Sequence, residues 1–153
     1  MIRVNVFSED NSWSKKIKKK SFFFNSICRS FPKKYKFLDK RVSLSLLLSN
    51  NKNIKKLNKK FRNKNKPTDV LSFPLSKKIK FKGHTYLGDI VISYNYMNDP
   101  KINEINIFKD RVIKIFIHGF LHLMGFDHNK DKDYKKMLKE ETKIYKSVIS
   151  KIY

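Results

Sequence analysis

Four short segments of the chain are rich in apolar residues that alternate with polar ones, as in half-buried β-strands. These segments cover about residues 2–7, 41–48, 69–74 and 86–93. The second segment alternates at first and ends in a continuous apolar run. Pro74 cannot donate to a strand ladder, so we predict that the third strand lies at an edge of the sheet or ends there.

A helical period of apolar residues marks four further segments, at about residues 12–29, 52–63, 108–124 and 131–149. Residues 94–106 are polar and predict an irregular connection with a short helical turn. The positions expected to be buried are Trp13, Ile17, Phe24, Ile27 and Cys28 in the first helix, Ile54, Leu57 and Phe61 in the second, Ile113, Ile117, Phe120 or Leu121 and Met124 in the third, and Met137, Leu138, Ile144, Tyr145 and Val148 in the last.

The order of these elements predicts an α+β fold with a four-stranded mixed sheet packed by helices. Residues 1–153 suffice for a single domain with a substantial core. No apolar run is long enough to span a membrane, and the N-terminus lacks a signal-peptide core. Cys28 is the only cysteine, so we expect no disulfide and a reducing compartment. We therefore expect a cytoplasmic protein with no membrane or disulfide-linked partner.

The formal net charge of +23 favours a polyanionic partner such as RNA. A second explanation stays open, because an A/T-rich genome would enrich lysine, asparagine, isoleucine and phenylalanine without any selection for binding. The run of lysines from 15 to 20 is interpreted as the solvated side of the first helix. The charge therefore permits nucleic-acid binding and makes any such binding dependent on salt.

Three of the four histidines lie within residues 118–128. His118 and His122 are four residues apart and project from one helix face. Gly125 can adopt the left-handed conformation that ends a helix, so that the chain reverses and returns His128 towards the other two. Three neutral imidazoles then form a transition-metal site with a coordination position open to water, as in catalytic zinc sites. Nickel, copper and iron also accept imidazole ligands. His84 has no such spacing and is interpreted as an ordinary exposed histidine.

The histidine spacing matches the zinc signature of metzincin proteases, H-E-x-x-H-x-x-G-x-x-H, with one difference. Gly119 occupies the place of the glutamate that serves those proteases as general base. The metal ligands of the signature are therefore present, but its proton acceptor is absent.

Three stretches of the chain resemble the YbeY family of bacterial endoribonucleases, also called rRNA maturation factors. Residues 118–128 are similar to the family signature H-G-x-L-H-L-x-G-[YF]-D-H, including Gly119. Residues 57–74 are similar to its L-N-x-x-[YF]-R and T-D-V-L-S-F-P segments, and residues 87–93 to its G-D-I-x-I-S strand. The order and spacing agree from about residue 40 to residue 145.

The resemblance implies a zinc-dependent endoribonuclease, with one Zn²⁺ per chain held by His118, His122 and His128. It implies single-stranded RNA as the substrate, with roles in 16S rRNA 3′-end maturation and ribosome quality control, and hence an rRNA precursor and the ribosomal subunit as partners. It also implies that Arg62 is a functional residue in the cleft.

We expect zinc to lower the pKa of its water to about 7, so that this water hydrolyses an RNA phosphodiester. Arg62 is the candidate for stabilising negative charge on the phosphoryl oxygens, although a snorkelling helix arginine is the alternative. Asp127 is a candidate catalytic base, but we favour a role in orienting a histidine or stabilising the turn. Asp69 and Ser72 are candidate substrate-binding residues, with Asp69 alternatively serving only to begin a strand.

Two other functions remain open at this point. One is a non-catalytic ribosome-assembly protein whose metal is structural. The other is a zinc metalloprotease, which Gly119 disfavours.

Overall fold

The computed structural model describes residues 1–152 and contains one four-stranded mixed sheet. Its strands are β1 (Ile2–Ser8), β2 (Arg41–Ser49), β3 (Val70–Pro74) and β4 (His84–Ser93). They lie in the order β1-β2-β4-β3, with β3 antiparallel to β4 and the other neighbours parallel. The predicted α+β fold is confirmed, and β3 is an edge strand that ends at Pro74.

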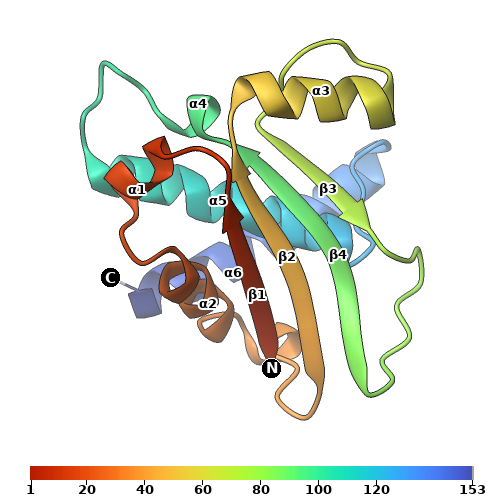
Figure 1. Ribbon diagram of the computed structural model, residues 1–153. Coiled ribbons are helices and arrows are strands. Elements are labelled where there is room, and N and C mark those ends of the chain that lie inside the picture. Colours follow the sequence, from red (N-terminus) through yellow and green to blue (C-terminus); the bar gives the residue numbers. More distant parts are fainter. Residues whose placement is uncertain (153) are drawn as a thin grey trace.

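The helices divide between the two faces of this sheet (Figure 1). On one face, α2 packs on β1 and α5 packs on β3 and β4, while α6 packs on α5. On the other face, α3 alone covers part of the sheet (Figure 1). The helices are α1 (Ser12–Lys16), α2 (Lys20–Arg29), α3 (Asn51–Arg62), α4 (Tyr94–Met97), α5 (Ile105–Leu123) and α6 (Asp131–Ile152), with a 3₁₀ turn at Lys33–Tyr35.

Strand β2 contributes to two separate cores because successive side chains of a strand point to opposite faces. Leu44, Leu46 and Leu48 are fully buried in the main core beneath α2 and α5. Leu47 points to the other face and packs against the small cluster that Ile54 of α3 forms with the sheet. The sequence of β2 therefore alternates at first and then becomes continuously apolar, because the end of this strand is covered on both faces.

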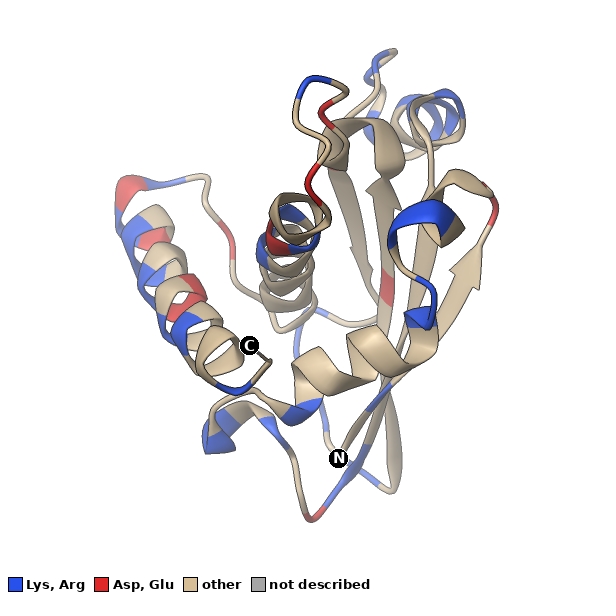
Figure 2. Ribbon diagram, turned by 90° about the vertical axis from the view of Figure 1, so that its left-hand side faces the viewer, with Lys and Arg blue, Asp and Glu red and all other residues tan. Residues whose placement is uncertain are grey.

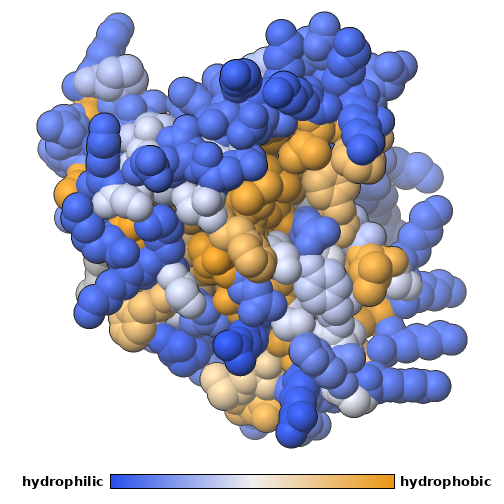
Figure 3. All heavy atoms as spheres, viewed as in Figure 1, coloured by the Kyte–Doolittle hydropathy of each residue, from blue (hydrophilic) through white to orange (hydrophobic). Residues whose placement is uncertain are grey.

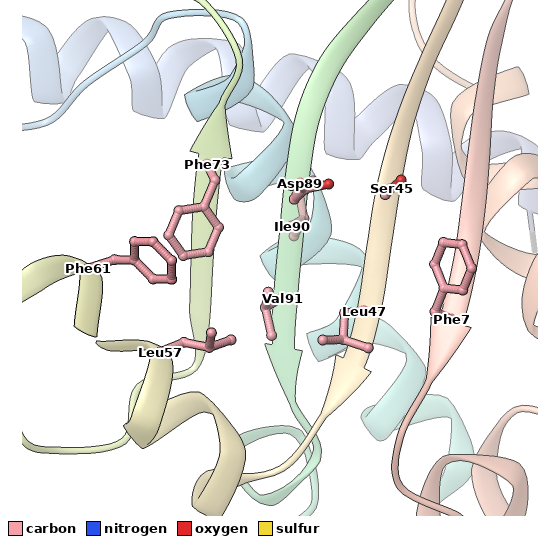
Figure 4. Close-up of a pocket in the computed structure, with 9 residues that line it drawn as sticks. All are labelled: Phe7, Ser45, Leu47, Leu57, Phe61, Phe73, Asp89, Ile90 and Val91. Atoms are coloured by element: carbon pink, nitrogen blue, oxygen red, sulfur yellow. The ribbon is translucent and has the colours of Figure 1, made fainter. Parts of the chain in front are cut away.

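The second face of the sheet is incompletely covered and contains an apolar hollow of about 540 Å³. Its side chains come from β1, β2, β3, β4 and α3 (Figure 4), and it forms the apolar region seen among polar residues in Figure 3. Phe7 and Phe61 are 59% and 57% exposed at its margins. The prediction that Phe61 is buried is wrong, because α3 extends beyond the small cluster that buries Ile54.

Two further details of the helices differ from the predictions. The helix expected over residues 12–29 is two helices, because Ile17 adopts an extended backbone at the end of α1. Ile17 still buries its side chain in the core that also contains Trp13, so tertiary packing overrides the helical propensity of the following lysines. Leu138 was expected to be buried, but it is 47% exposed on the outer side of α6.

Gly88 lies where β4 passes very close to β3. Its φ of +138° is unfavourable for other residues, and a Cβ there would lie 2.2 Å from the carbonyl oxygen of Phe73. We expect Gly88→Ala to lower the free energy of unfolding by about 3 kcal/mol or more, as measured by urea denaturation. Gly83→Ala is the control, because Gly83 also has a positive φ but a Cβ there would meet no atom within 4 Å. Equal losses of unfolding free energy in Gly88→Ala and Gly83→Ala would contradict the explanation that a Cβ at position 88 clashes with β3.

Cys28 is buried, and burial raises the pKa of its thiol well above the ordinary value. The thiol is therefore held in its neutral, unreactive form.

Among the helices of residues 1–152, none combines the length and the apolar character needed to cross a bilayer.

Candidate metal centre and cleft

The three histidines predicted to bind a metal converge at the end of α5. Their candidate ligand nitrogens all lie within 4.8 Å of one another. The ring centres of His118 and His122 are 4.6 Å apart, and those of His122 and His128 are 5.0 Å apart. His118 and His122 are half-buried, whereas His128 is exposed. The sequence spacing therefore brings all three imidazoles to one point.

Gly125 makes this convergence possible by ending α5 in a left-handed conformation, with φ at +96°. The N–H of Gly125 donates to the carbonyl of His122, and the N–H of Phe126 donates to the carbonyl of Leu121. These two bonds form a Schellman motif. The motif reverses the chain within a few residues and returns His128 to the side of α5 that carries the other two histidines.

Hydrogen bonds at the outer nitrogens determine which ring atoms face the centre. Nδ1 of His118 lies 2.7 Å from Oε1 of Glu141, and Nδ1 of His122 lies 3.0 Å from the carbonyl oxygen of Phe126. An ionised carboxylate and a carbonyl can only accept, so both Nδ1 atoms carry the hydrogen. In the neutral rings each Nε2 then presents a lone pair.

These two Nε2 atoms lie only 3.0 Å apart. Two lone pairs at that distance repel unless a cation or a proton lies between them. The pKa of His122 is lowered by burial and by its neighbours His118 and His128, which favours the neutral, metal-binding form. The residues present therefore fit a transition metal ion.

Glu141 is a site residue that the sequence pattern did not reveal. It comes from α6, and its side chain and that of His118 are each about one quarter exposed. The histidine motif ends at His128, and Glu141 lies thirteen positions later on another helix. No motif spacing therefore predicted that Glu141 would contact the histidines. A carboxylate on the outer nitrogen of a metal-binding histidine fixes the tautomer and raises the basicity of the ligand.

We expect Glu141→Gln to weaken zinc binding by about 10-fold to 100-fold, as measured by competition with a chromogenic chelator. An amide is a weaker acceptor than a carboxylate, so it holds the His118 tautomer less firmly. Glu140→Gln provides the control, because Glu140 is the neighbouring carboxylate but bonds to Tyr35. An unchanged zinc affinity in Glu141→Gln would exclude the proposed positioning role.

The histidine cluster opens into a cleft of about 520 Å³, here called the histidine cleft, whose lining includes Arg62, Ser72, His122, Asp127 and His128. Arg62 is the last residue of α3 and reaches this cleft over the edge strand β3. Its Nη2 donates to the carbonyl oxygen of Ser72 at 3.3 Å. The guanidinium is therefore held at the cleft by a backbone contact.

Gly119 allows α5 to lie close to the sheet beside this centre. A Cβ at this buried position would lie 3.1 Å from Cγ2 of Ile90 and 3.1 Å from Oγ of Ser72. The Ser72 hydroxyl donates to the carbonyl of Gly119 at 3.0 Å. The helix face that carries glutamate in metzincins is thus pressed against β3 and β4, where a large side chain has no space.

The remaining predicted residues lie at different distances from the centre. Asp127 lines the cleft, and its Oδ1 accepts the backbone N–H of His128 at 2.7 Å while its Oδ2 accepts from Asn129 at 2.8 Å. Asp69 is not among the residues that line the cleft, and its Oδ1 accepts the backbone N–H of Val70 at 2.7 Å. Asp127 thus stabilises the turn, and Asp69 begins a strand. Their roles in substrate binding or catalysis remain predictions.

His84 is exposed, as expected, and begins β4 instead of lying in the preceding loop. Its Nε2 lies 2.8 Å from the hydroxyl of Ser43. It does not belong to the histidine cluster. The apolar hollow on the other face of the sheet is similar in volume to the histidine cleft. Among the described residues that line it, Asp89 is the only titratable one. Of these two hollows, the histidine cleft is therefore the one that gathers several titratable side chains.

Comparison with known proteins identifies close relatives. The model of the family described as endoribonuclease YbeY matches residues 6–149. An endoribonuclease YbeY from Pelagibacter ubique is 64% identical over 152 residues, covering 99% of each chain. One from Persephonella marina is 37% identical over 111 residues, covering 71% of this chain and 72% of the relative. A solution structure of a Thermotoga maritima protein superposes with a TM-score of 0.52 at 27% identity, covering 97% of this chain and 89% of the other.

Proposed function

The chain belongs to the YbeY family of endoribonucleases, and from this premise we propose that it is a single-domain enzyme that uses zinc to hydrolyse single-stranded RNA in the histidine cleft. The observation that carries the proposal is the convergence of three histidines, two of which line one cleft together with Arg62. We propose maturation of the 16S rRNA 3′ end and ribosome quality control as its roles. An rRNA precursor and the ribosomal subunit would then be its partners in the cytoplasm.

The inner nitrogens of His118, His122 and His128 would hold the zinc ion. When bound, zinc would supply a Lewis acid and would lower the pKa of a water molecule. Glu141 and the carbonyl of Phe126 keep the first two rings in the tautomer that directs a lone pair inward. The two short bonds of the Asp127 carboxylate hold the turn that presents His128.

Arg62 is suited to binding the phosphate that is cleaved. Negative charge grows on the non-bridging phosphoryl oxygens in the transition state, and a guanidinium donates to two such oxygens at once. Arg62 bonds to the Ser72 carbonyl through Nη2, which restricts the side chain to the cleft before substrate arrives. We therefore assign to Arg62 the stabilisation of the transition state. Ser72 supports it through the backbone, and a direct contact of its hydroxyl with RNA remains a prediction.

The experiment that tests this function compares single-stranded and duplex RNA of the same sequence, with and without a chelator. We expect the purified protein to cut the single strand, to leave the duplex intact and to lose activity when the metal is removed. Zinc added back should restore cutting. Failure to cut any RNA, together with tight binding to the ribosomal subunit, would favour the assembly-protein alternative.

A protease function receives no support from the site. The metzincin base is absent, and Gly119 is packed where its replacement would need space. Cleavage of an unfolded protein by the zinc-loaded enzyme would overturn this conclusion.

A further inference from the structure

A third hollow of the molecule is lined by positive charges and shares none of its described lining residues with the histidine cleft or the apolar hollow. It has a volume of about 640 Å³ and lies between α1, α2, the start of α5 and the end of α6. We call it the cationic groove. Its charged lining residues are Lys15, Lys16, Lys18, Lys19, Arg29, Lys109 and Lys151.

Within residues 1–152, no carboxylate side chain is among those that line the cationic groove. Residues 11–38 contain nine lysines and arginines but no aspartate or glutamate. Among the described residues, none of the groove cations takes part in an ion pair within 4.0 Å. Like charges in one concave surface repel each other, and an anionic ligand would relieve this repulsion.

The lysines of α6 show a different arrangement. Glu140 of this helix pairs with Lys34 and Lys143, and further carboxylates lie along the same helix. In Figure 2, which faces this side of the molecule, α6 carries both colours of charge, whereas the junction of α1 and α2 is blue. Residues 40–68 also hold ten lysines and arginines and no acid, so the feature that distinguishes the groove is the gathering of seven cations in one hollow.

Aromatic rings lie beside the cations of the groove. The guanidinium of Arg29 lies 5.5 Å from the ring centre of Phe22, and Nζ of Lys109 lies 5.9 Å from that of Phe23. Phe22 is 66% exposed, so one large ring is available to a ligand. Cations that follow a backbone and rings that stack on bases are the two elements of single-stranded nucleic-acid sites.

We propose that the cationic groove is a second RNA-binding surface, which holds the phosphate backbone of a single-stranded substrate outside the histidine cleft. The inference rests on the proposed function, since RNA is the anion that the enzyme meets. An anionic membrane fits the surface less well, because it would need an apolar helix face to insert. Phe24, Ile27 and Cys28 of α2 are buried in the core, which leaves Phe22 projecting.

The groove and the cleft are held at a fixed separation by α5. Lys109 lies near the start of this helix and His122 near its end, thirteen residues later. At 1.5 Å per residue the two positions are about 20 Å apart along the helix axis. A stacked trinucleotide is about 10 Å long, so it cannot occupy both sites, whereas a long single strand can.

The test uses Lys18→Gln/Lys19→Gln, which removes two exposed charges from the groove. The control is Lys139→Gln/Lys146→Gln, which removes two exposed charges from α6. We measure affinity for a long single-stranded RNA across a range of salt concentrations, and kcat/KM for that RNA and for a trinucleotide. We expect the groove variant to bind the long RNA at least about tenfold more weakly, and its salt slope to fall by about 1.4. Its preference for the long RNA over the trinucleotide should fall by a similar factor.

Three outcomes would overturn the proposal. The first is an equal loss of RNA affinity in the groove and control variants, and the second is no loss of RNA affinity in either variant. The third is tighter binding of the wild-type protein to phosphatidylserine vesicles than to RNA. Failure of the wild-type enzyme to cut either the long RNA or the trinucleotide would instead count against the catalytic site. The affinity measurement would still decide on the groove in that case, so the two failures are distinguishable.

Discussion

Replacing His122 by alanine should abolish stoichiometric zinc binding and lower kcat for RNA cleavage by about 1,000-fold or more. His122 is half-buried at the middle of the cluster, and its Nε2 faces that of His118 at 3.0 Å. Removing this ring takes away one of the three proposed ligands and leaves an opening at the centre of the cluster. Zinc content by mass spectrometry and single-turnover cleavage of single-stranded RNA measure the two effects.

His84→Ala serves as the matched control, because His84 is exposed and lies outside the cluster. This variant should keep both its zinc and its activity. Thermal unfolding of both variants in the presence of chelator separates metal loss from damage to the fold. If His122→Ala cut RNA at the wild-type rate without bound metal, the zinc-dependent mechanism would be wrong.

Replacing Arg62 by alanine should lower kcat/KM by about 100-fold to 1,000-fold while zinc content stays unchanged. This loss corresponds to roughly 3 to 4 kcal/mol of transition-state stabilisation, the range found when a single charge-stabilising donor is removed. Arg62 does not belong to the histidine cluster, and its guanidinium donates to the backbone carbonyl of Ser72 in β3 at the cleft. Arg62→Lys should recover only part of the activity, since it keeps the charge but loses the planar pair of donors.

Lys59→Ala is the control for Arg62, because it removes one exposed positive charge from the same helix, one turn earlier. Its activity should change much less than that of Arg62→Ala. Equal losses of kcat/KM in the two variants would assign the effect to the overall positive electrostatic field of α3. A full loss of zinc in Arg62→Ala would assign Arg62 to the integrity of the metal centre.

Local patterns predicted the parts of this structure that depend on neighbouring residues. The alternation in β2, the glycine that ends α5 and the spacing of His118, His122 and His128 all act within a few residues of the chain. Each of them appears in the structure as expected. The edge position of β3 also followed from one residue, Pro74, which lacks the N–H that a central strand needs.

Features that depend on distant contacts escaped prediction. Glu141 reaches His118 only because α6 packs on α5, and no motif encodes that distance. The break at Ile17 arises from burial of its side chain in the core, against the helical propensity of the lysines that follow. Phe61 fits the apolar stripe of α3, but the sheet beneath it is not covered far enough to bury it. Arg62 was identified by family resemblance, and its position at the cleft depends on α3 reaching over β3.

The measurement that tests the catalytic assignment most directly is cleavage of a single-stranded rRNA precursor spanning the 16S 3′ end, with the new ends mapped. Zinc-loaded wild-type protein and zinc-loaded Arg62→Ala are compared at equal metal content. We predict that the wild type cuts near the mature 3′ end and that Arg62→Ala cuts at least about 100-fold more slowly. Equal cutting by both proteins, or no cutting by either, would contradict the assignment of the histidine cleft as the catalytic site for RNA.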